Sequence, residues 1–94
     1  MAQVICEVST GRGNREKNVA VKDVFGKRRY LRVETDFLAK VDSKDYLPVG
    51  VAGIDHEKKM ALIELPQESD SGARRIWVWL DTLQGLQQAA GAAT

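Results

Sequence analysis

The chain has 94 residues, of which 44% are hydrophobic and 29% are charged, and its formal net charge is +1. This length predicts one domain, residues 1–94, with a single core, and the near-neutral charge excludes a global field that would attract a polyanion. The lone cysteine excludes an internal disulfide. A lone thiol, an N-terminus unlike a secretory signal and the lack of any apolar run near roughly 20 residues predict a soluble, cytoplasmic protein without membrane contact.

The first two predicted strands flank a charged loop. Residues 3–9 place Val4 and Cys6 on one face, and this alternation predicts a strand. Residues 10–18 consist of turn formers and charged or polar side chains, a composition typical of a loop. Alternation resumes over residues 19–25, where we expect the second strand.

A tight turn separates this strand from the third. Phe25 ends the second predicted strand on the same face as Val19 and Val21, and residues 26–27 are expected to form the turn. Residues 28–34 then alternate again and predict a third strand. In that strand Tyr30 and Arg32 lie on the face opposite to the aliphatic residues.

The middle of the chain is less regular. Residues 35–45 space their apolar side chains as in one short helical turn or an irregular crossing. Residues 47–54 predict a fourth strand that contains Pro48, Gly50 and Gly53. Proline favours an edge or the start of a strand, and interior glycines favour a bulge or a sharp bend.

The C-terminal half predicts two more strands. Residues 59–65 are apolar on both faces, which indicates a central strand, and Pro66 ends it. Residues 75–80 predict the sixth strand. Asp81 is a candidate cap for a short following helix, and residues 85–94 are expected to be a frayed helix or a disordered tail.

Four segments carry a resemblance to a known family: Val49-Gly50-Val51, Ala61-Leu62-Ile63-Glu64-Leu65-Pro66, Arg75-Ile76-Trp77-Val78 and Leu83. A bent hairpin, a loop, a strand with aromatic residues and a short closing turn follow one another over residues 46–83, and this order resembles the later strands of SH3-like small β-barrels. The resemblance implies a mostly β fold, a small antiparallel SH3-like barrel of five to six strands with a short C-terminal helix or tail. Residues 10–18 lack the aromatic cluster that such domains carry in their first long loop, so the resemblance does not extend to binding of proline-rich peptides.

Both tryptophans of the chain occur in the predicted strand 75–80. Alternation places Trp77 and Trp79 on the face opposite to its aliphatic residues. If the aliphatic face points to the core, the two indoles, with Tyr30 beside them, form an exposed aromatic surface that binds a protein partner or a second copy of the chain. The alternative is that residues 35–45 or the C-terminal helix cover the tryptophans, which then belong to the core.

Basic side chains are concentrated in the segment 12–32. The candidates for nucleic-acid contacts are Arg12, Arg15, Lys17, Lys27, Arg28, Arg29 and Arg32. If these side chains converge on one face, they would bind phosphates with a steep salt dependence, and nearby aromatic residues would stack on bases. If they are spread over separate turns, they only solubilise the loops and protect strand edges.

No motif in the chain predicts catalysis or a cofactor. His56 stands in a predicted turn without a nucleophile nearby, and Cys6 has no activating group beside it in the sequence. The acidic loop 67–72 matches no calcium-loop spacing. We therefore expect a small non-enzymatic interaction module without metal or cofactor. Its leading partner is a protein or a second copy, and nucleic acid is the alternative.

Overall fold

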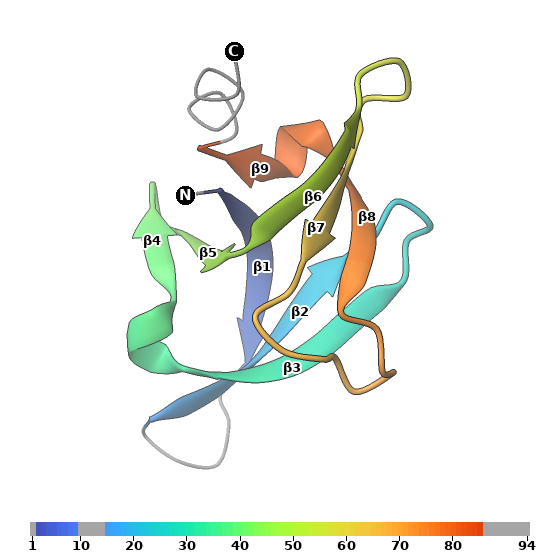
Figure 1. The fold of residues 1–94 in the computed structure, drawn as a ribbon. Coiled ribbons are helices and arrows are strands. Elements are labelled where there is room, and N and C mark those ends of the chain that lie inside the picture. The colour runs from blue at the N-terminus through green and yellow to red at the C-terminus, as the bar shows by residue number, and fades with distance from the viewer. Residues whose placement is uncertain (1, 10–14, 86–94) are drawn as a thin grey trace.

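The computed structural model describes residues 2–9 and 15–85, which form a mostly β, antiparallel structure (Figure 1). No α-helix occurs in the part of the chain that is described. The strands are β1 (Gln3–Ser9), β2 (Glu16–Lys22), β3 (Arg28–Glu34), β4 (Ala39–Val41), β5 (Lys44–Pro48), β6 (Gly50–Asp55), β7 (Met60–Glu64), β8 (Arg75–Trp79) and β9 (Leu83–Gln84), with short 3-10 turns at η1 (Thr35–Phe37) and η2 (Leu80–Thr82).

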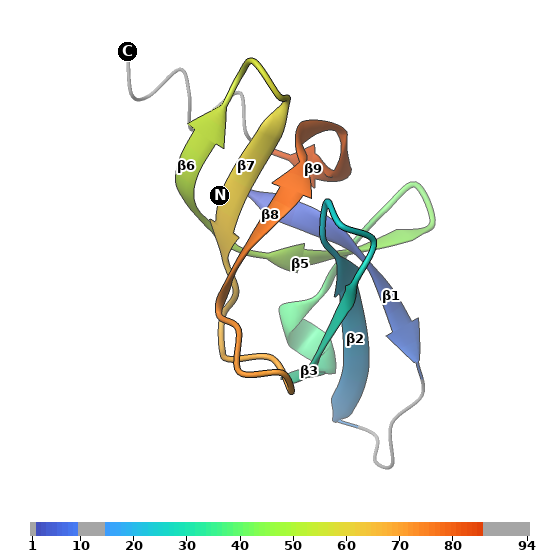
Figure 2. The same cartoon turned by 90° about the vertical axis from the view of Figure 1, so that its right-hand side faces the viewer.

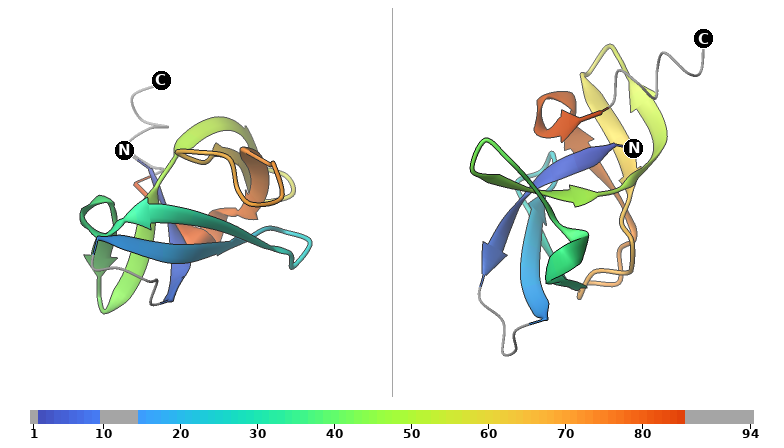
Figure 3. Two further views of the ribbon diagram at one scale, coloured as in Figure 1. Left: turned by 90° about the horizontal axis from the view of Figure 1, so that it is seen from below. Right: turned by 90° about the vertical axis from the view of Figure 1, so that its left-hand side faces the viewer.

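The strands are arranged in two antiparallel sheets. One has the order β3-β2-β1-β5-β4, with β9 also paired to β1, and the other has the order β6-β7-β8. The chain passes from the first sheet to the second at Val49, between β5 and β6, where its N–H donates to the carbonyl of Ala2 over 3.0 Å. Figure 3 shows β2 and β3 on one side of the molecule and β6, β7 and β8 on the other.

The core lies between the inner faces of the two sheets. β1, β2, β3, β7 and β8 contribute alternate residues to it, because successive side chains of a strand point to opposite faces. The buried aliphatic residues of these strands and of β5 include Val4, Val19, Val21, Leu31, Val33, Leu47, Ala61, Ile63, Ile76 and Val78. Their burial confirms the faces that alternation predicts for β1, β3, β7 and β8.

The second predicted strand is shifted. We expected it over residues 19–25, whereas β2 runs from Glu16 to Lys22 and Phe25 lies in a turn. The reason is Asp23, whose carboxylate accepts backbone N–H groups of the turn and thereby ends the strand early. The pairing of β2 with β3 starts at Glu16 opposite Glu34, so the predicted loop is also shorter than expected.

Residues 35–45 contain more structure than predicted. The expected helical turn is the short η1, and a hairpin of β4 and β5 follows it. Asp42 and Ser43 have φ of 51° and 67° and form the two-residue connection of this hairpin. Two left-handed residues suit the twist of a tight hairpin, but without glycine the turn carries a weak sequence signal.

The glycines of residues 47–54 predicted a bulge or a sharp bend, and the structure has a change of sheet at Val49 and a bulge in β6. The predicted single strand is divided into β5 and β6, and the register of β6 against β7 shifts between Val51 and Gly53. β7 is the central strand of its sheet, as its two apolar faces predicted.

The C-terminal prediction needs correction. Residues 80–82 form η2, and Leu83–Gln84 then pair with Gln3 and Val4 of β1 where we expected a helix. The remainder of the predicted tail, residues 86–94, lies outside the described residues. The nine strands of the described residues also exceed the expected five to six, and the two sheets that they form do not join into a closed barrel. Within residues 2–9 and 15–85, no helix has the length and apolar character needed to span a membrane.

Candidate interaction surface

The outer surface of the three-stranded sheet carries both tryptophans of the chain, Trp77 and Trp79. Ile76 and Val78 are buried against the core, so Trp77 and Trp79 point outward from β8. The register places Leu62 opposite Trp77 and Met60 opposite Trp79. We call Met60, Leu62, Trp77 and Trp79 the aromatic face. Trp79 is 45% exposed, and the other three are half-buried.

The β2–β3 turn lies alongside β8, at the edge of the three-stranded sheet. The N–H of Val24 donates to the carbonyl of Trp77 over 2.9 Å, which fixes the turn alongside the aromatic face. The next residue, Phe25, is 84% exposed, more than any other large hydrophobic residue described. A large apolar side chain in this position raises the apolar area presented by this part of the surface.

A buried carboxylate holds this turn in shape. Asp23 is 3% exposed, and its Oδ1 accepts the N–H groups of Phe25 and Lys27, both over 2.9 Å. The N–H of Asp23 donates to the carbonyl of Lys27, and Gly26 has a φ of +81°, which favours glycine. Phe25 is therefore displayed on an ordered turn.

The same carboxylate connects the turn to the β7–β8 loop. Its Oδ2 accepts the Nε–H of Arg29 over 3.3 Å, and the guanidinium Nη1 donates to Ser71 Oγ over 2.8 Å. Ser71 in turn hydrogen-bonds to the buried Ser69 over 3.0 Å. Arg29, which the sequence placed among the nucleic-acid candidates, is thus engaged in a structural network.

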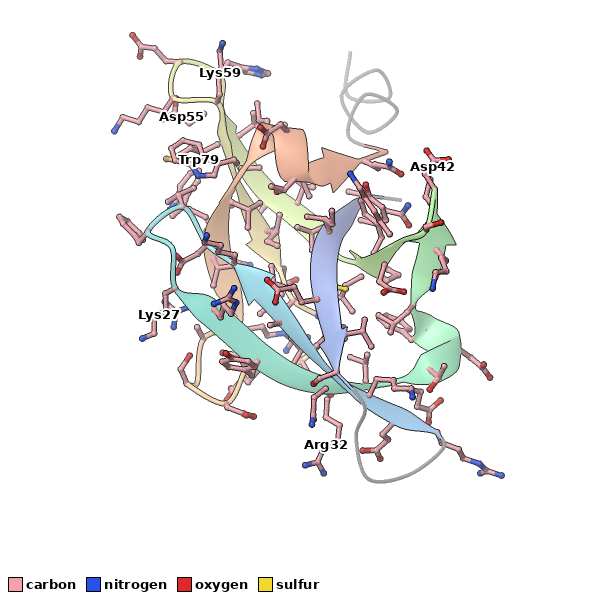
Figure 4. The ribbon with its side chains drawn as sticks, turned by 180° about the vertical axis from the view of Figure 1, so that it is seen from behind. Lys27, Arg32, Asp42, Asp55, Lys59 and Trp79 are labelled. Carbon is pink, nitrogen blue, oxygen red and sulfur yellow. The ribbon has the colours of Figure 1, made fainter. Side chains whose placement is uncertain are left out.

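A cavity of about 370 Å³ adjoins the aromatic face beneath the β6–β7 turn. Its lining residues are Lys58, Lys59, Trp79, Leu80 and Asp81. Figure 4 shows Trp79 below the turn that carries Asp55 and Lys59. The cavity combines the indole with two cationic side chains and one carboxylate, so its walls offer both apolar contact and charge.

Tyr30 lies on the other sheet. It is 50% exposed on the outer face of β3, opposite Ala20 of β2. The tryptophans belong to β8, in the three-stranded sheet. Tyr30 and the two tryptophans that we expected beside it therefore belong to different sheets.

The basic candidates are distributed over several places. Arg15 precedes β2 and Lys27 follows it, so these two charges lie at opposite ends of the strand. Figure 4 shows Lys27 on the β2–β3 turn and Arg32 near the far end of β3. Lys17 lies within β2, facing Val33 of β3, and Arg12 falls outside the described residues.

Two further arginines of this group are paired with carboxylates. Arg28 contacts Glu7 over 3.3 Å, and Arg32 contacts Glu16 over 3.7 Å. Both pairs are largely exposed, and such pairs are worth at most about 1 kcal/mol. They nevertheless lower the local positive charge of the β1–β2–β3 face.

The surroundings of Cys6 and His56 do not support a catalytic role, and the described residues offer no metal site. Burial, and to a lesser extent the charge of Asp45, raises the pKa of the Cys6 thiol from 9.0 to about 12, which disfavours the reactive thiolate. His56 is exposed in the β6–β7 turn. No cluster of three or more histidine, cysteine or acidic residues suited to a metal occurs in the described segments.

Sequence reasoning missed three members of this surface. Met60 and Leu62 were assigned to a central strand without regard to which face was open. Phe25 was assigned to a strand, although an aspartate two residues before it and a glycine after it are typical of a turn capped by a side-chain oxygen.

Comparison with known proteins does not identify a function for this surface, so the functional assignment depends on the residues described above. Searches of the chain against protein-family models, curated proteins and solved structures found no significant match.

Proposed function

We propose that the protein is a small non-enzymatic interaction module that binds a protein partner through the aromatic face and Phe25. One observation carries the proposal: the 45% exposed Trp79 and the 84% exposed Phe25 lie on neighbouring segments that a backbone hydrogen bond holds together. Aromatic side chains that remain exposed in a folded monomer commonly become the centre of a protein interface.

The rigidity of the surface favours binding. Trp79 projects from a strand, and Phe25 from a turn whose N–H groups are bonded to the buried Asp23. Little conformational entropy is lost when pre-ordered side chains are covered by a partner. Full burial of a side chain of this size contributes about 1.5–3 kcal/mol, so two such residues are enough to dominate a modest affinity.

The alternative, nucleic-acid binding through residues 12–32, has less support. Arg28, Arg29 and Arg32 are paired with carboxylates. Arg15 and Lys27 lie at opposite ends of β2. Binding to a phosphate backbone draws its affinity from contiguous cations, and this distribution divides them.

The proposal also covers the type of barrel and the location of the protein. We place the two sheets in an SH3-like, half-closed barrel, supported by the bend at Val49 and by the η2 turn that leads β9 back to β1. A cytoplasmic location is supported by the single free, buried thiol of Cys6, which suits a reducing compartment.

Site-specific photo-crosslinking in the source cells tests the proposal. A photoreactive phenylalanine analogue at position 25 should give a discrete crosslinked protein, and Trp79→Ser in the same chain should reduce its yield about tenfold. The matched control carries the analogue at Asp42, which is exposed in the β4–β5 turn, away from Trp79 (Figure 4). Equal products from both positions, or a yield insensitive to Trp79→Ser, would contradict the assignment.

A fluorescence titration distinguishes this proposal from the alternative of nucleic-acid binding. Short single-stranded oligonucleotides are added while tryptophan fluorescence is followed at low and physiological salt. We expect no quenching. Saturable quenching that weakens steeply with salt would favour the nucleic-acid reading.

A further inference from the structure

Hydrogen bonds hold the walls of the cavity beneath the β6–β7 turn in place. The N–H of Lys58 donates to Asp55 Oδ1 over 3.0 Å, and the N–H of Leu80 donates to the carbonyl of Lys59 over 2.9 Å. Figure 2 shows the β6–β7 turn and the η2 turn at the same end of the three-stranded sheet. The volume of about 370 Å³ falls within the range of about 300–1,000 Å³ that is typical of ligand pockets. The cavity is therefore formed before any ligand arrives.

The cavity presents apolar and cationic groups together. Trp79 is 45% exposed, and Leu80 packs partly against the core. Lys58 and Lys59 line the same cavity, and neither forms an ion pair with another residue in the described part of the chain. Asp81 is the only acidic residue among the lining residues. The walls therefore carry a single net positive charge beside an indole.

Lys59 occupies a backbone position that favours glycine. Its φ is 58°, and Gly26 and Gly72 adopt positive φ values in the β2–β3 turn and the β7–β8 loop. Glycine reaches this region without steric cost, whereas a side chain there destabilises the fold. Backbone strain of this kind is concentrated at ligand-binding positions, so the lysine side chain is a candidate contact for a ligand.

We propose that the cavity binds an acidic peptide segment, in which an apolar side chain packs on Trp79 and a neighbouring carboxylate meets Lys58 and Lys59. The inference rests on the proposed function and names the chemistry of the partner. A single carboxylate beside an apolar side chain complements walls with one net positive charge. A run of phosphates would bring several negative charges close to Asp81, so this composition disfavours nucleic acid as the occupant.

Selection of a random heptapeptide library on the immobilised full chain tests the proposal. Enriched sequences should carry an aspartate or a glutamate next to, or one position removed from, a leucine, phenylalanine or tryptophan. Fluorescence anisotropy then measures the affinity of one synthesised, labelled peptide from this set. Lys58→Glu should weaken that affinity about tenfold. Lys44→Glu, an equal charge reversal at an exposed position of β5, is the matched control and should leave it unchanged.

Lys59→Gly separates the effect on binding from the effect on folding. Glycine relieves the strain at φ of 58°, so the thermal midpoint should rise by about 5 °C. The affinity for the labelled peptide should nevertheless fall several-fold, because one ammonium group is lost. Asp81→Asn should raise the affinity, since it removes the negative charge from the walls.

The outcomes distinguish this inference from the proposed function. Enriched sequences without an acidic residue, or unchanged affinity in Lys58→Glu and Lys59→Gly, would overturn the acidic-peptide assignment. The proposed function would still stand if Trp79→Ser abolished binding of the selected peptide. Binding that survives Trp79→Ser, or a selection without any enriched sequence, would overturn both. Competition by a short single-stranded oligonucleotide would also overturn the inference and assign the cavity to phosphate.

Discussion

Replacement of Asp23 by alanine is the perturbation with the largest expected effect among polar residues. The substitution removes a carboxylate that is 3% exposed, that accepts two backbone N–H groups over 2.9 Å and that pairs with Arg29 over 3.3 Å. Hydrogen bonds to a charged group contribute about 1.5–3 kcal/mol each. The methyl group of alanine replaces none of them.

Two effects make the expected loss of stability smaller than the sum of these hydrogen-bond contributions. The variant no longer desolvates a carboxylate on folding, and the Arg29 side chain is 19% exposed, so water partly solvates the cation left behind. We therefore expect a loss of about 2–4 kcal/mol in the free energy of unfolding. A domain of this size has a total of about 5–14 kcal/mol, so the thermal midpoint should fall by roughly 10 °C or more.

Urea unfolding followed by tryptophan fluorescence measures the change. Asp23→Asn keeps an oxygen for the two N–H groups but presents an amide to Arg29, and it should cost about half as much. Asp70→Ala is the control, since that exposed carboxylate accepts no hydrogen bond from the described residues. An Asp23→Ala variant within about 0.5 kcal/mol of the wild type would refute the reasoning.

Three further predictions concern the core, the loops and the thiol. Ile63→Ala should cost about 2–5 kcal/mol in urea unfolding, whereas Trp79→Ser, on the outer face, should cost far less. Gly72→Ala should cost about 1–2 kcal/mol in thermal unfolding, because Gly72 has a φ of +85° in open space. Cys6 should resist alkylation near neutral pH until the chain unfolds. Because its pKa is raised from 9.0 to about 12 in the folded state, stability should decline as the pH rises through that interval.

Local pattern was enough to predict most strands and the direction of their side chains. β1 and β3 have the predicted bounds, β7 is one residue shorter than predicted at each end, and β8 is one residue shorter at its C-terminal end. The errors occurred where a side chain competes with the strand, as at Asp23, or where a turn forms without glycine, as at Asp42 and Ser43. The C-terminal helix failed for another reason, because pairing with β1 outweighs the helical signal of residues 81–84.

The faces of the strands follow from the order of residues alone, because alternation holds in any extended chain whatever lies beside it. Ile76 and Val78 therefore had to oppose Trp77 and Trp79. The surroundings of those faces depend on contacts between residues far apart in the chain. Arg29 and Ser71 are 42 positions apart, and the turn with Phe25 lies against β8 through the bond from Val24 to Trp77. No local periodicity encodes such contacts, so only the tertiary structure brings the turn with Phe25 alongside β8 and assigns Tyr30 to the other sheet.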